Sequence, residues 1–294
     1  MTVLVTGATG TVGRQVVHHL LERGGKVRAL TRDPARAALP YGVEVVAGDL
    51  TDVAGLEAAF DGVTAVHLIN FGVGCRPLAN GRDIVALAER AGVGRATVLG
   101  GWQEGTLEPA VRASGLEWTF LQPTQFMANF VNDWGESLRT TGRVREPYGD
   151  RQSPPVDEHD IGAIAAAVLT QGGHGGRSYH LTGPEVLTAR RMVAILAEAT
   201  GRDLRFEELT PDEVRREWST PDRRPPLALF RAFAEIEGAD EVDMVESLLR
   251  IYGTPNPFAT RLTGDVEQVV GRPPRTFAQW AAEHAPHFVP ADAR

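Results

Sequence analysis

The chain has 294 residues, of which 43% are hydrophobic and 23% are charged, and this composition excludes disordered and fibrous proteins. Its formal net charge is −8, so no overall positive field favours nucleic acid or an anionic membrane as a partner, and we expect a small-molecule ligand. Cys75 is the only cysteine, which excludes an intrachain disulfide and any all-cysteine metal site and favours a cytoplasmic location.

Short apolar runs alternate with segments of helical periodicity through residues 1–125. Residues 3–5 predict a strand rather than a signal peptide, and residues 12–21 have the spacing of a helix. Further strands are expected at 27–30, 43–46, 65–69, 96–99 and 117–121, with helices near 52–61, 79–92 and 105–114. No apolar run is long enough to span a bilayer. The alternation predicts an α/β fold with a doubly wound parallel sheet and helices on both faces.

The alternation ends after residue 123. Residues 125–139 look helical, residues 143–157 are rich in proline, glycine and charge, and residues 160–169 form an alanine-rich helical pattern. A strand at 179–181 is expected to complete the sheet late in the chain. From about 184 onward helices dominate, with predictions at 188–200, 211–218, 226–237 and 240–252.

A glycine motif, G-x-x-G-x-x-G, follows the first predicted strand and opens the first predicted helix. Gly7 permits a tight turn, Gly10 lets the backbone approach a pyrophosphate, and Gly13 allows the helix to pack close to the sheet. The N–H groups at the helix start would face the phosphates. The alternative is a turn that has lost its ligand, but the order of strand, motif and helix favours nucleotide binding. The predicted cofactor contacts of this motif are Gly7, Thr9, Gly10, Thr11 and Val12.

The residues after the second and third predicted strands bear on which dinucleotide is bound. Arg32 favours NADP(H), because an arginine here accommodates a 2′-phosphate, whereas Asp33 beside it leaves NAD(H) open. Asp49 and Leu50 are predicted to place a carboxylate near the adenine amino group and an apolar side chain against its ring. For Asp49 the alternative is a helix N-cap.

Polar and aromatic residues follow the later strands, where open α/β sheets bind ligands. Asn70 is predicted to contact the nicotinamide ribose, with Phe71 beside it. The predicted substrate-pocket residues are Trp102, Gln103, Gln125, Phe126 and Asn129. For the aromatic residues, core packing is the alternative. No metal site is predicted, since the neighbouring His18 and His19 point in different directions on a helix.

These patterns together predict two domains. Residues 1–183 are expected to form a Rossmann dinucleotide-binding domain, with its core in 1–125 and with 126–157 contributing to the substrate lobe. Residues 184–294 are expected to form that smaller, mostly helical substrate lobe.

Seven segments of the sequence carry a resemblance to a known family. They are TGATGTVG at 6–13, VRALTRDP at 27–34, GVEVVAGDLTD at 42–52, ASGLEWTFLQPTQFMANF at 113–130, VDEHDIGAIAAAVL at 156–169, YHLTGPEVLT at 179–188 and GRPPRTFAQWAAEHA at 271–285. Through them the chain resembles the NmrA-like family of atypical short-chain dehydrogenase/reductases along nearly its whole length, most weakly over 205–262. The resemblance implies a Rossmann domain with a smaller substrate lobe, NADP(H) more often than NAD(H), and either reductase activity or cofactor sensing.

Two positions depart from the family pattern. Members usually have a serine and a long loop after the fifth strand, whereas this chain reads Leu99-Gly100-Gly101-Trp102 and reaches Glu108 after a short segment. Members also tend to have arginine where this chain has Gln122. Both departures bear on how the cofactor and its neighbours are held.

The wider superfamily reduces carbonyls with a Tyr-x-x-x-Lys pair, in which the lysine lowers the pKa of the tyrosine phenol. The residues four positions after the four tyrosines are Val45, Gln152, Gly183 and Asn256, so the pair is absent. The only lysine is Lys26, before the second predicted strand. An electrophilic acceptor needs no side-chain acid, because the cofactor supplies the hydride and water the proton. No catalytic residue is identified.

The leading hypothesis is an NADP(H)-dependent oxidoreductase that transfers hydride to an electrophilic small molecule, quinone-like or aromatic. One alternative is an NAD(P)-binding redox sensor that binds a protein partner without turnover. Another is a tailoring enzyme that retains its cofactor and catalyses no net redox change. Neither nucleic acid nor a membrane is expected as a partner.

Overall fold

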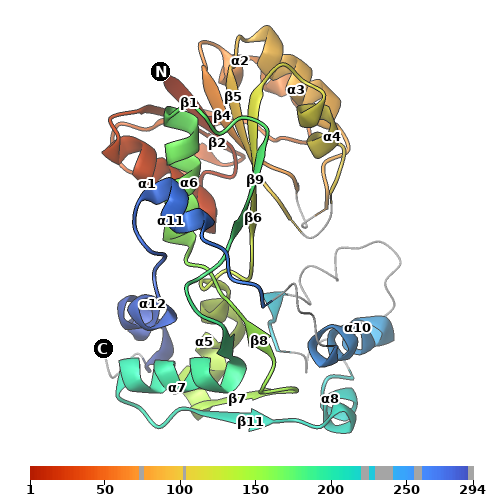
Figure 1. Cartoon of the computed structure of the whole chain (residues 1–294). Helices are drawn as coiled ribbons and strands as arrows, with labels where there is room; N and C mark the ends of the chain where they lie inside the picture. Colours follow the sequence, from red (N-terminus) through yellow and green to blue (C-terminus); the bar gives the residue numbers. More distant parts are fainter. Residues whose placement is uncertain (73–75, 102–103, 220–224, 229–240, 255–259, 291–294) are drawn as a thin grey trace. The chain divides into compact units, whose positions relative to one another are not determined.

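The computed structural model describes residues 1–72, 76–101, 104–219, 225–228, 241–254 and 260–290 (Figure 1). The chain forms two compact units, each of which is discontinuous in sequence. Unit 1 comprises Met1–Pro123, Glu158–Leu181 and Thr263–Pro273. Unit 2 comprises Thr124–Asp157, Thr182–Leu262 and Pro274–Arg294. In the described ranges, no helix has the length and apolar character needed to cross a membrane.

Unit 1 is built on a seven-stranded sheet with the order β3-β2-β1-β4-β5-β6-β9. Its strands are β1 (Thr2–Val5), β2 (Lys26–Thr31), β3 (Glu44–Ala47), β4 (Ala65–Ile69), β5 (Arg95–Leu99), β6 (Glu117–Pro123) and β9 (Arg177–Leu181). Every pairing is parallel, so the predicted doubly wound α/β fold is confirmed. The order runs outward from β1 in both directions, and its switch point lies between β1 and β4.

Helices cover both faces of this sheet (Figure 1). One face carries α1 (Thr11–Glu22) and α6 (Glu158–Thr170), with α11 (Asp265–Val270) packed beside α6. The other face carries α2 (Glu57–Phe60), α3 (Gly81–Arg90) and α4 (Leu107–Arg112) over a buried aliphatic core. The short 3₁₀ helices η1 (Pro34–Arg36) and η2 (Val53–Gly55) lie in the connections. Gly162 allows α6 to pack closely on α1, because any residue with a Cβ at this position would place it 2.5 Å from the Gln15 Cβ atom.

The last strand of the sheet comes late in the chain, as predicted. β9 pairs with β6 after the chain has passed through unit 2. Residues 263–273 also belong to unit 1, where Asp265 accepts a hydrogen bond of 2.7 Å from the His180 N–H and Arg272 pairs at 2.7 Å with Asp160. Residues 124–157 belong to unit 2, to which 126–157 were expected to contribute, whereas residues 263–273 belong to unit 1 and not to the part of the chain after 184. Within unit 1, the pair with Arg272 places a cation beside the fully buried Asp160.

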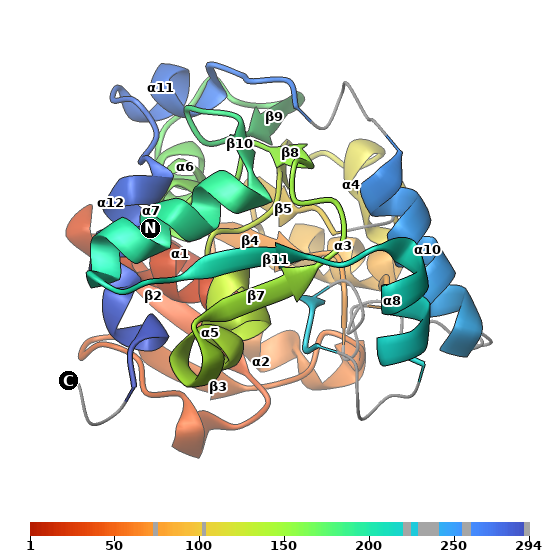
Figure 2. The same cartoon turned by 90° about the horizontal axis from the view of Figure 1, so that it is seen from below.

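Unit 2 contains helices and two small sheets. Its helices are α5 (Asn129–Thr141), α7 (Ala189–Thr200), α8 (Pro211–Glu217), α10 (Glu241–Gly253), α12 (Phe277–His284) and the 3₁₀ helix η5 (Ala285–Phe288). Its strands are β7 (Arg143–Glu146), β8 (Gln152–Ser153), β10 (Leu187–Thr188) and β11 (Arg205–Glu208). β7 pairs in parallel with β11, as Figure 2 shows, and β8 pairs antiparallel with β10. The sequence did not predict these sheets in the lobe that it describes as mostly helical.

Two helices predicted in unit 2 differ from the structure or lie mostly outside its described residues. The helix predicted from residue 125 begins only at Asn129. Before it, the Gln125 carbonyl accepts from the Val156 N–H at 2.9 Å and the Met127 N–H donates to the Val156 carbonyl at 3.0 Å, which forms a parallel bridge at Phe126. The helix predicted at 226–237 lies mostly outside the described residues.

Candidate functional site

The carboxyl ends of the parallel strands meet at one edge of the unit 1 sheet. Gly7 follows β1, Arg32 follows β2, Asp49 lies just beyond β3, and Asn70 follows β4. Because these strands are neighbours, the structure brings together the residues that the sequence predicted as cofactor contacts. They are Gly7, Thr9, Gly10, Thr11, Val12, Arg32, Asp49, Leu50, Asn70 and Phe71.

The turn after β1 requires its glycines. Gly7 has a φ of +60°, in the left-handed region that favours glycine, and a Cβ there would lie 3.1 Å from the Ile69 side chain. The Gly10 N–H closes the turn by donating to the Gly7 carbonyl at 2.9 Å. A Cβ at Gly13 would lie only 2.1 Å from the same carbonyl oxygen. Helix α1 therefore starts in contact with the turn, as predicted for a phosphate-binding motif.

The amino end of α1 offers backbone donors. Gly10 is the N-cap, and the first helical hydrogen bond runs from the Arg14 N–H to the Gly10 carbonyl at 3.0 Å. The N–H groups of Thr11, Val12 and Gly13 therefore have no acceptor within the helix. No side chain caps this fully described helix, and its first turn carries no acidic residue. These donors and the positive end of the helix dipole suit a bound phosphate. Val12 is 4% exposed and its side chain packs in the core, so the predicted contact of Val12 would be made by its backbone N–H.

Arg32 and Asp49 lie at the ends of the paired strands β2 and β3. Arg32 is exposed, whereas Asp49 accepts hydrogen bonds of 2.9 Å from both the N–H and the hydroxyl of Thr51. These bonds, together with a weaker attraction to Arg32, hold the pKa of Asp49 below its ordinary value. Asp49 thus forms a local turn with Thr51 and is not the helix N-cap considered as the alternative, since the N-cap of η2 is Asp52. Leu50 is 6% exposed within the aliphatic core, and the adenine contacts predicted for both residues remain predictions.

A buried hydrogen-bonded pair lies beyond β4 and β5. Asn70 and Glu108 are 2% and 3% exposed, and the Asn70 Nδ2 donates to Glu108 Oε1. The second oxygen of Glu108 accepts from the Gly105 N–H at 2.9 Å. Because a carboxylate only accepts, the carboxamide oxygen of Asn70 faces away from Glu108, toward Gly101. Sequence reasoning missed Glu108 as a partner of Asn70, since an acidic residue in the first turn of a helix is ordinary.

The structure describes three of the five predicted substrate-pocket residues. Trp102 and Gln103 lie outside the described residues. The half-buried Gln125, Phe126 and Asn129 belong to unit 2, where the Gln125 side chain accepts from the Ser153 hydroxyl at 3.3 Å and Phe126 bridges to Val156. Their contact with a substrate remains a prediction.

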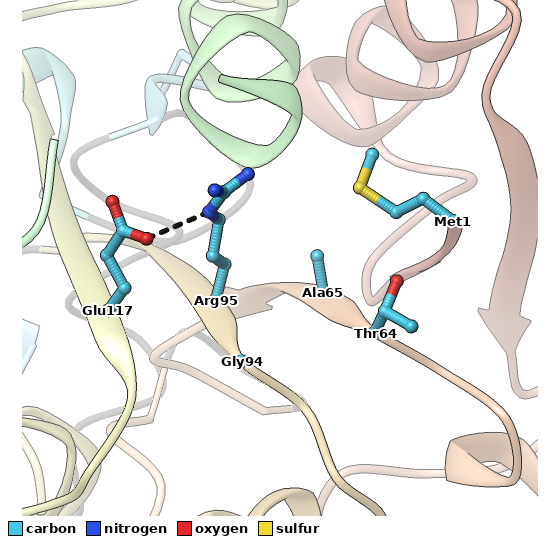
Figure 3. Close-up of a pocket in the computed structure, with 6 residues that line it drawn as sticks. All are labelled: Met1, Thr64, Ala65, Gly94, Arg95 and Glu117. Carbon is cyan, nitrogen blue, oxygen red and sulfur yellow. Dashed lines mark hydrogen bonds and ion pairs between the residues drawn. The ribbon is translucent and has the colours of Figure 1, made fainter. Parts of the chain in front are cut away.

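A cavity of about 410 Å³ lies at the opposite edge of the sheet, where the strands begin (Figure 3). Its lining includes the ion pair between Arg95 and Glu117, with an N···O distance of 2.9 Å. The lining residues are Met1, Thr64, Ala65, Gly94, Arg95 and Glu117. Open α/β sheets bind ligands at the carboxyl edge, so we assign this cavity no part in cofactor binding.

The positions of Lys26 and Tyr179 in the sheet are consistent with the absence of a Tyr-x-x-x-Lys pair from the sequence. Lys26 begins β2 and so lies at the amino edge, away from the glycine turn. Tyr179 lies in β9, 5% exposed, with its hydroxyl 2.8 Å from the His174 Nδ1 atom. Over the ranges that the structure describes, no cluster of three or more metal-ligating side chains is present either.

Comparisons with known proteins place the chain in one family. A model of the NmrA-like family matches residues 1–97. The chain is 37% identical to a (4-alkanoyl-5-oxo-2,5-dihydrofuran-3-yl)methyl phosphate reductase of Streptomyces griseus, over 98% of this chain and 99% of that protein. It is 30% identical to an NAD(P)H azoreductase of Xenophilus azovorans, over 97% and 99%. The fold is similar to the triphenylmethane reductase of Citrobacter sp. complexed with NADP(H), with a TM-score of 0.72, 22% identity, and coverage of 97% and 100%.

Proposed function

Because the chain belongs to the NmrA-like family, we propose that it is an NADP(H)-dependent oxidoreductase that transfers hydride to an electrophilic small molecule. The observation that carries the proposal is the junction of β1 and α1. There three glycines bring an uncapped helix end to the carboxyl edge of the sheet, with Arg32 at the end of the neighbouring strand. Backbone donors and an exposed guanidinium are the groups that a phosphorylated dinucleotide requires.

The described residues fit this cofactor. The N–H groups of Thr11, Val12 and Gly13 would hold the pyrophosphate, and Arg32 would hold the 2′-phosphate that distinguishes NADPH from NADH. When bound, NADPH supplies the hydride. The turn glycines have no side chains, so the pyrophosphate can approach their backbone closely. The single lysine, Lys26, lies at the opposite edge of the sheet.

The acceptor class is proposed from the relatives and from the missing Tyr-x-x-x-Lys pair. The name of the Streptomyces relative describes a furan ring double bond conjugated with two carbonyl groups, and the Xenophilus relative is an azoreductase. Both acceptors are conjugated, electron-poor double bonds. Hydride adds to one end of such a bond, the displaced electron pair moves to the other end, and a proton from water completes the reduction. No side-chain acid is needed for this step.

The reductase activity is tested by following the loss of NADPH absorbance with a panel of acceptors. Quinones, acyl butenolides and azo compounds are expected to be reduced, and a simple ketone such as cyclohexanone is the negative control. Reduction of the ketone but of none of the conjugated acceptors would contradict the proposal. A redox sensor would bind both cofactor forms with different affinities and consume NADPH with none of the acceptors.

The cofactor preference is tested by calorimetric titration of Arg32→Ala with NADPH and NADH. Loss of the ion pair with the 2′-phosphate is expected to weaken NADPH binding by about tenfold and to leave NADH binding nearly unchanged. Arg23→Ala, at the other end of α1, is the matched control. Equal weakening of both cofactors would contradict the role given to Arg32. The proposed substrate contacts are still Trp102, Gln103, Gln125, Phe126 and Asn129, and a cytoplasmic location remains a prediction from composition.

A further inference from the structure

Arg14 follows the glycine motif directly, in the first turn of α1. Its guanidinium donates to three carbonyl oxygens: Nε to Thr9 at 3.0 Å, Nη1 to Ala38 at 2.8 Å and Nη2 to Ala37 at 2.9 Å. Thr9 belongs to the glycine turn, whereas Ala37 and Ala38 belong to the loop that follows β2. A single side chain therefore ties this loop to the turn.

The backbone of Arg14 is held firmly enough to serve as an anchor. Its N–H donates to the Gly10 carbonyl at 3.0 Å, and the close contact of Gly13 with the turn fixes the start of the helix. The planar guanidinium presents its N–H groups in a fixed fork, so it can reach three carbonyls at once.

The loop that Arg14 holds has a conformation that needs support. Ala38 has a φ of +45°, a left-handed conformation that is unfavourable for any residue with a Cβ. Such backbone persists where surrounding contacts hold it. Those contacts are the bond from Arg14 to the Ala38 carbonyl and the burial of Ala37, which is 3% exposed.

The same loop begins with Arg32. Only Asp33 and the short helix η1 separate Arg32 from Ala37, so holding the loop at Ala37 and Ala38 restricts the direction of the Arg32 backbone. Each of the three guanidinium nitrogens of Arg14 donates to a protein carbonyl, and these bonds direct the fork toward the turn and the loop. Arg14 thus acts on a ligand through the loop.

We propose that Arg14 is a positioning residue that sets the preference for NADPH over NADH by holding the loop of Arg32. This inference rests on the proposed function, in which Arg32 binds the 2′-phosphate. It extends that function by assigning part of the cofactor specificity to a residue that does not contact the cofactor. Loosening the loop lowers the affinity for NADPH, whose extra phosphate depends on Arg32, and spares NADH.

The test compares Arg14→Met and Arg14→Lys by calorimetric titration with NADPH and with NADH. Met removes all three hydrogen bonds, while Lys keeps the charge and lacks the planar fork. Both variants are expected to bind NADPH about tenfold more weakly and to change NADH binding by less than about threefold. Arg23→Met, which removes a charge from the far end of the same helix, is expected to match the wild type. Wild-type NADPH affinity in Arg14→Lys, or equal losses for both cofactors, would overturn the inference.

Amide hydrogen exchange supplies a second readout that needs no ligand. Amides of the non-proline residues of 33–40 are expected to exchange faster in both Arg14 variants, with the exchange of β1 and β4 unchanged. If the wild type bound neither cofactor, the proposed function would fail. The exchange result would then still decide whether Arg14 holds the loop, since unchanged exchange at 33–40 would overturn that claim.

Discussion

Acidification is expected to destabilise unit 1 through His67. This histidine lies in β4, fully buried, and its Nδ1 atom lies 2.8 Å from the Thr97 hydroxyl. Burial lowers the pKa of His67 from 6.5 to about 4, because the charged imidazolium would lose its hydration inside the sheet. The ring is therefore neutral in the folded protein at neutral pH.

The sign and the size of the effect follow from linkage. The unfolded chain binds a proton at His67 more readily than the folded chain, so the stability is complete above pH 6.5 and is lost as the pH falls toward about 4. One pH unit corresponds to about 1.4 kcal/mol, which gives a full loss of about 3 kcal/mol. At about pH 5, where the folded ring is still mostly neutral, the loss is about 2 kcal/mol.

The measurement is urea unfolding of the wild type and of His67→Asn at about pH 8 and about pH 5. The asparagine carboxamide can still bond the Thr97 hydroxyl but does not titrate. The cavity that it leaves lowers stability at both pH values and cancels in the difference. Burial also lowers the pKa of His19, but His19 is present in both proteins and cancels too. The wild type is expected to lose about 2 kcal/mol more than the variant, and an equal loss in both would refute the reasoning.

Two further predictions concern the carboxyl edge of the sheet. Gly13→Ala places a Cβ 2.1 Å from the Gly7 carbonyl oxygen, and we expect it to cost about 2 kcal/mol of stability and to weaken NADPH binding at least about tenfold. Thermal unfolding and calorimetry measure these changes against Gly94→Ala, whose Cβ has ordinary contacts, and equal behaviour of the two variants would contradict the packing argument. Glu108→Gln leaves one acceptor for two donors, so thermal unfolding should report a loss of about 2 kcal/mol. The exposed Glu104→Gln is its control, with a loss below about 1 kcal/mol, and losses of similar size would show that the buried pair is not needed.

Much of unit 1 could be predicted because local patterns determine it. Apolar runs of strand length alternate with helical periodicity, and such alternation forms a parallel sheet by short right-handed connections. The glycine turn was predictable for the same reason, since Gly7, Gly10 and Gly13 satisfy steric needs that arise within a few residues of one another. The role of Arg32 in binding a 2′-phosphate was predicted from its place after β2 alone and remains a prediction.

The partners of several buried polar groups could not be predicted. The amide nitrogen of Asn70 binds Glu108, which is 38 residues away in sequence, and the contact of Asn70 with the cofactor remains a prediction. The bonds from Arg14 to Ala37 and Ala38 span 23 and 24 residues. Neither contact produces a periodic pattern in the sequence, because each hydrogen bond involves only two groups that lie far apart in the chain.

The sequence by itself determined the order of the elements, the parallel sheet and the glycine turn, because each depends on residues that are near neighbours in the chain. Only the tertiary structure decided that residues 263–273 return to unit 1 and that residues 125–127 bond to Val156 before α5 begins. Buried charges such as Asp160 must find a cationic partner, and extended backbone must find a hydrogen-bonding neighbour. In a chain of this length such partners can lie anywhere, so these contacts are decided by packing.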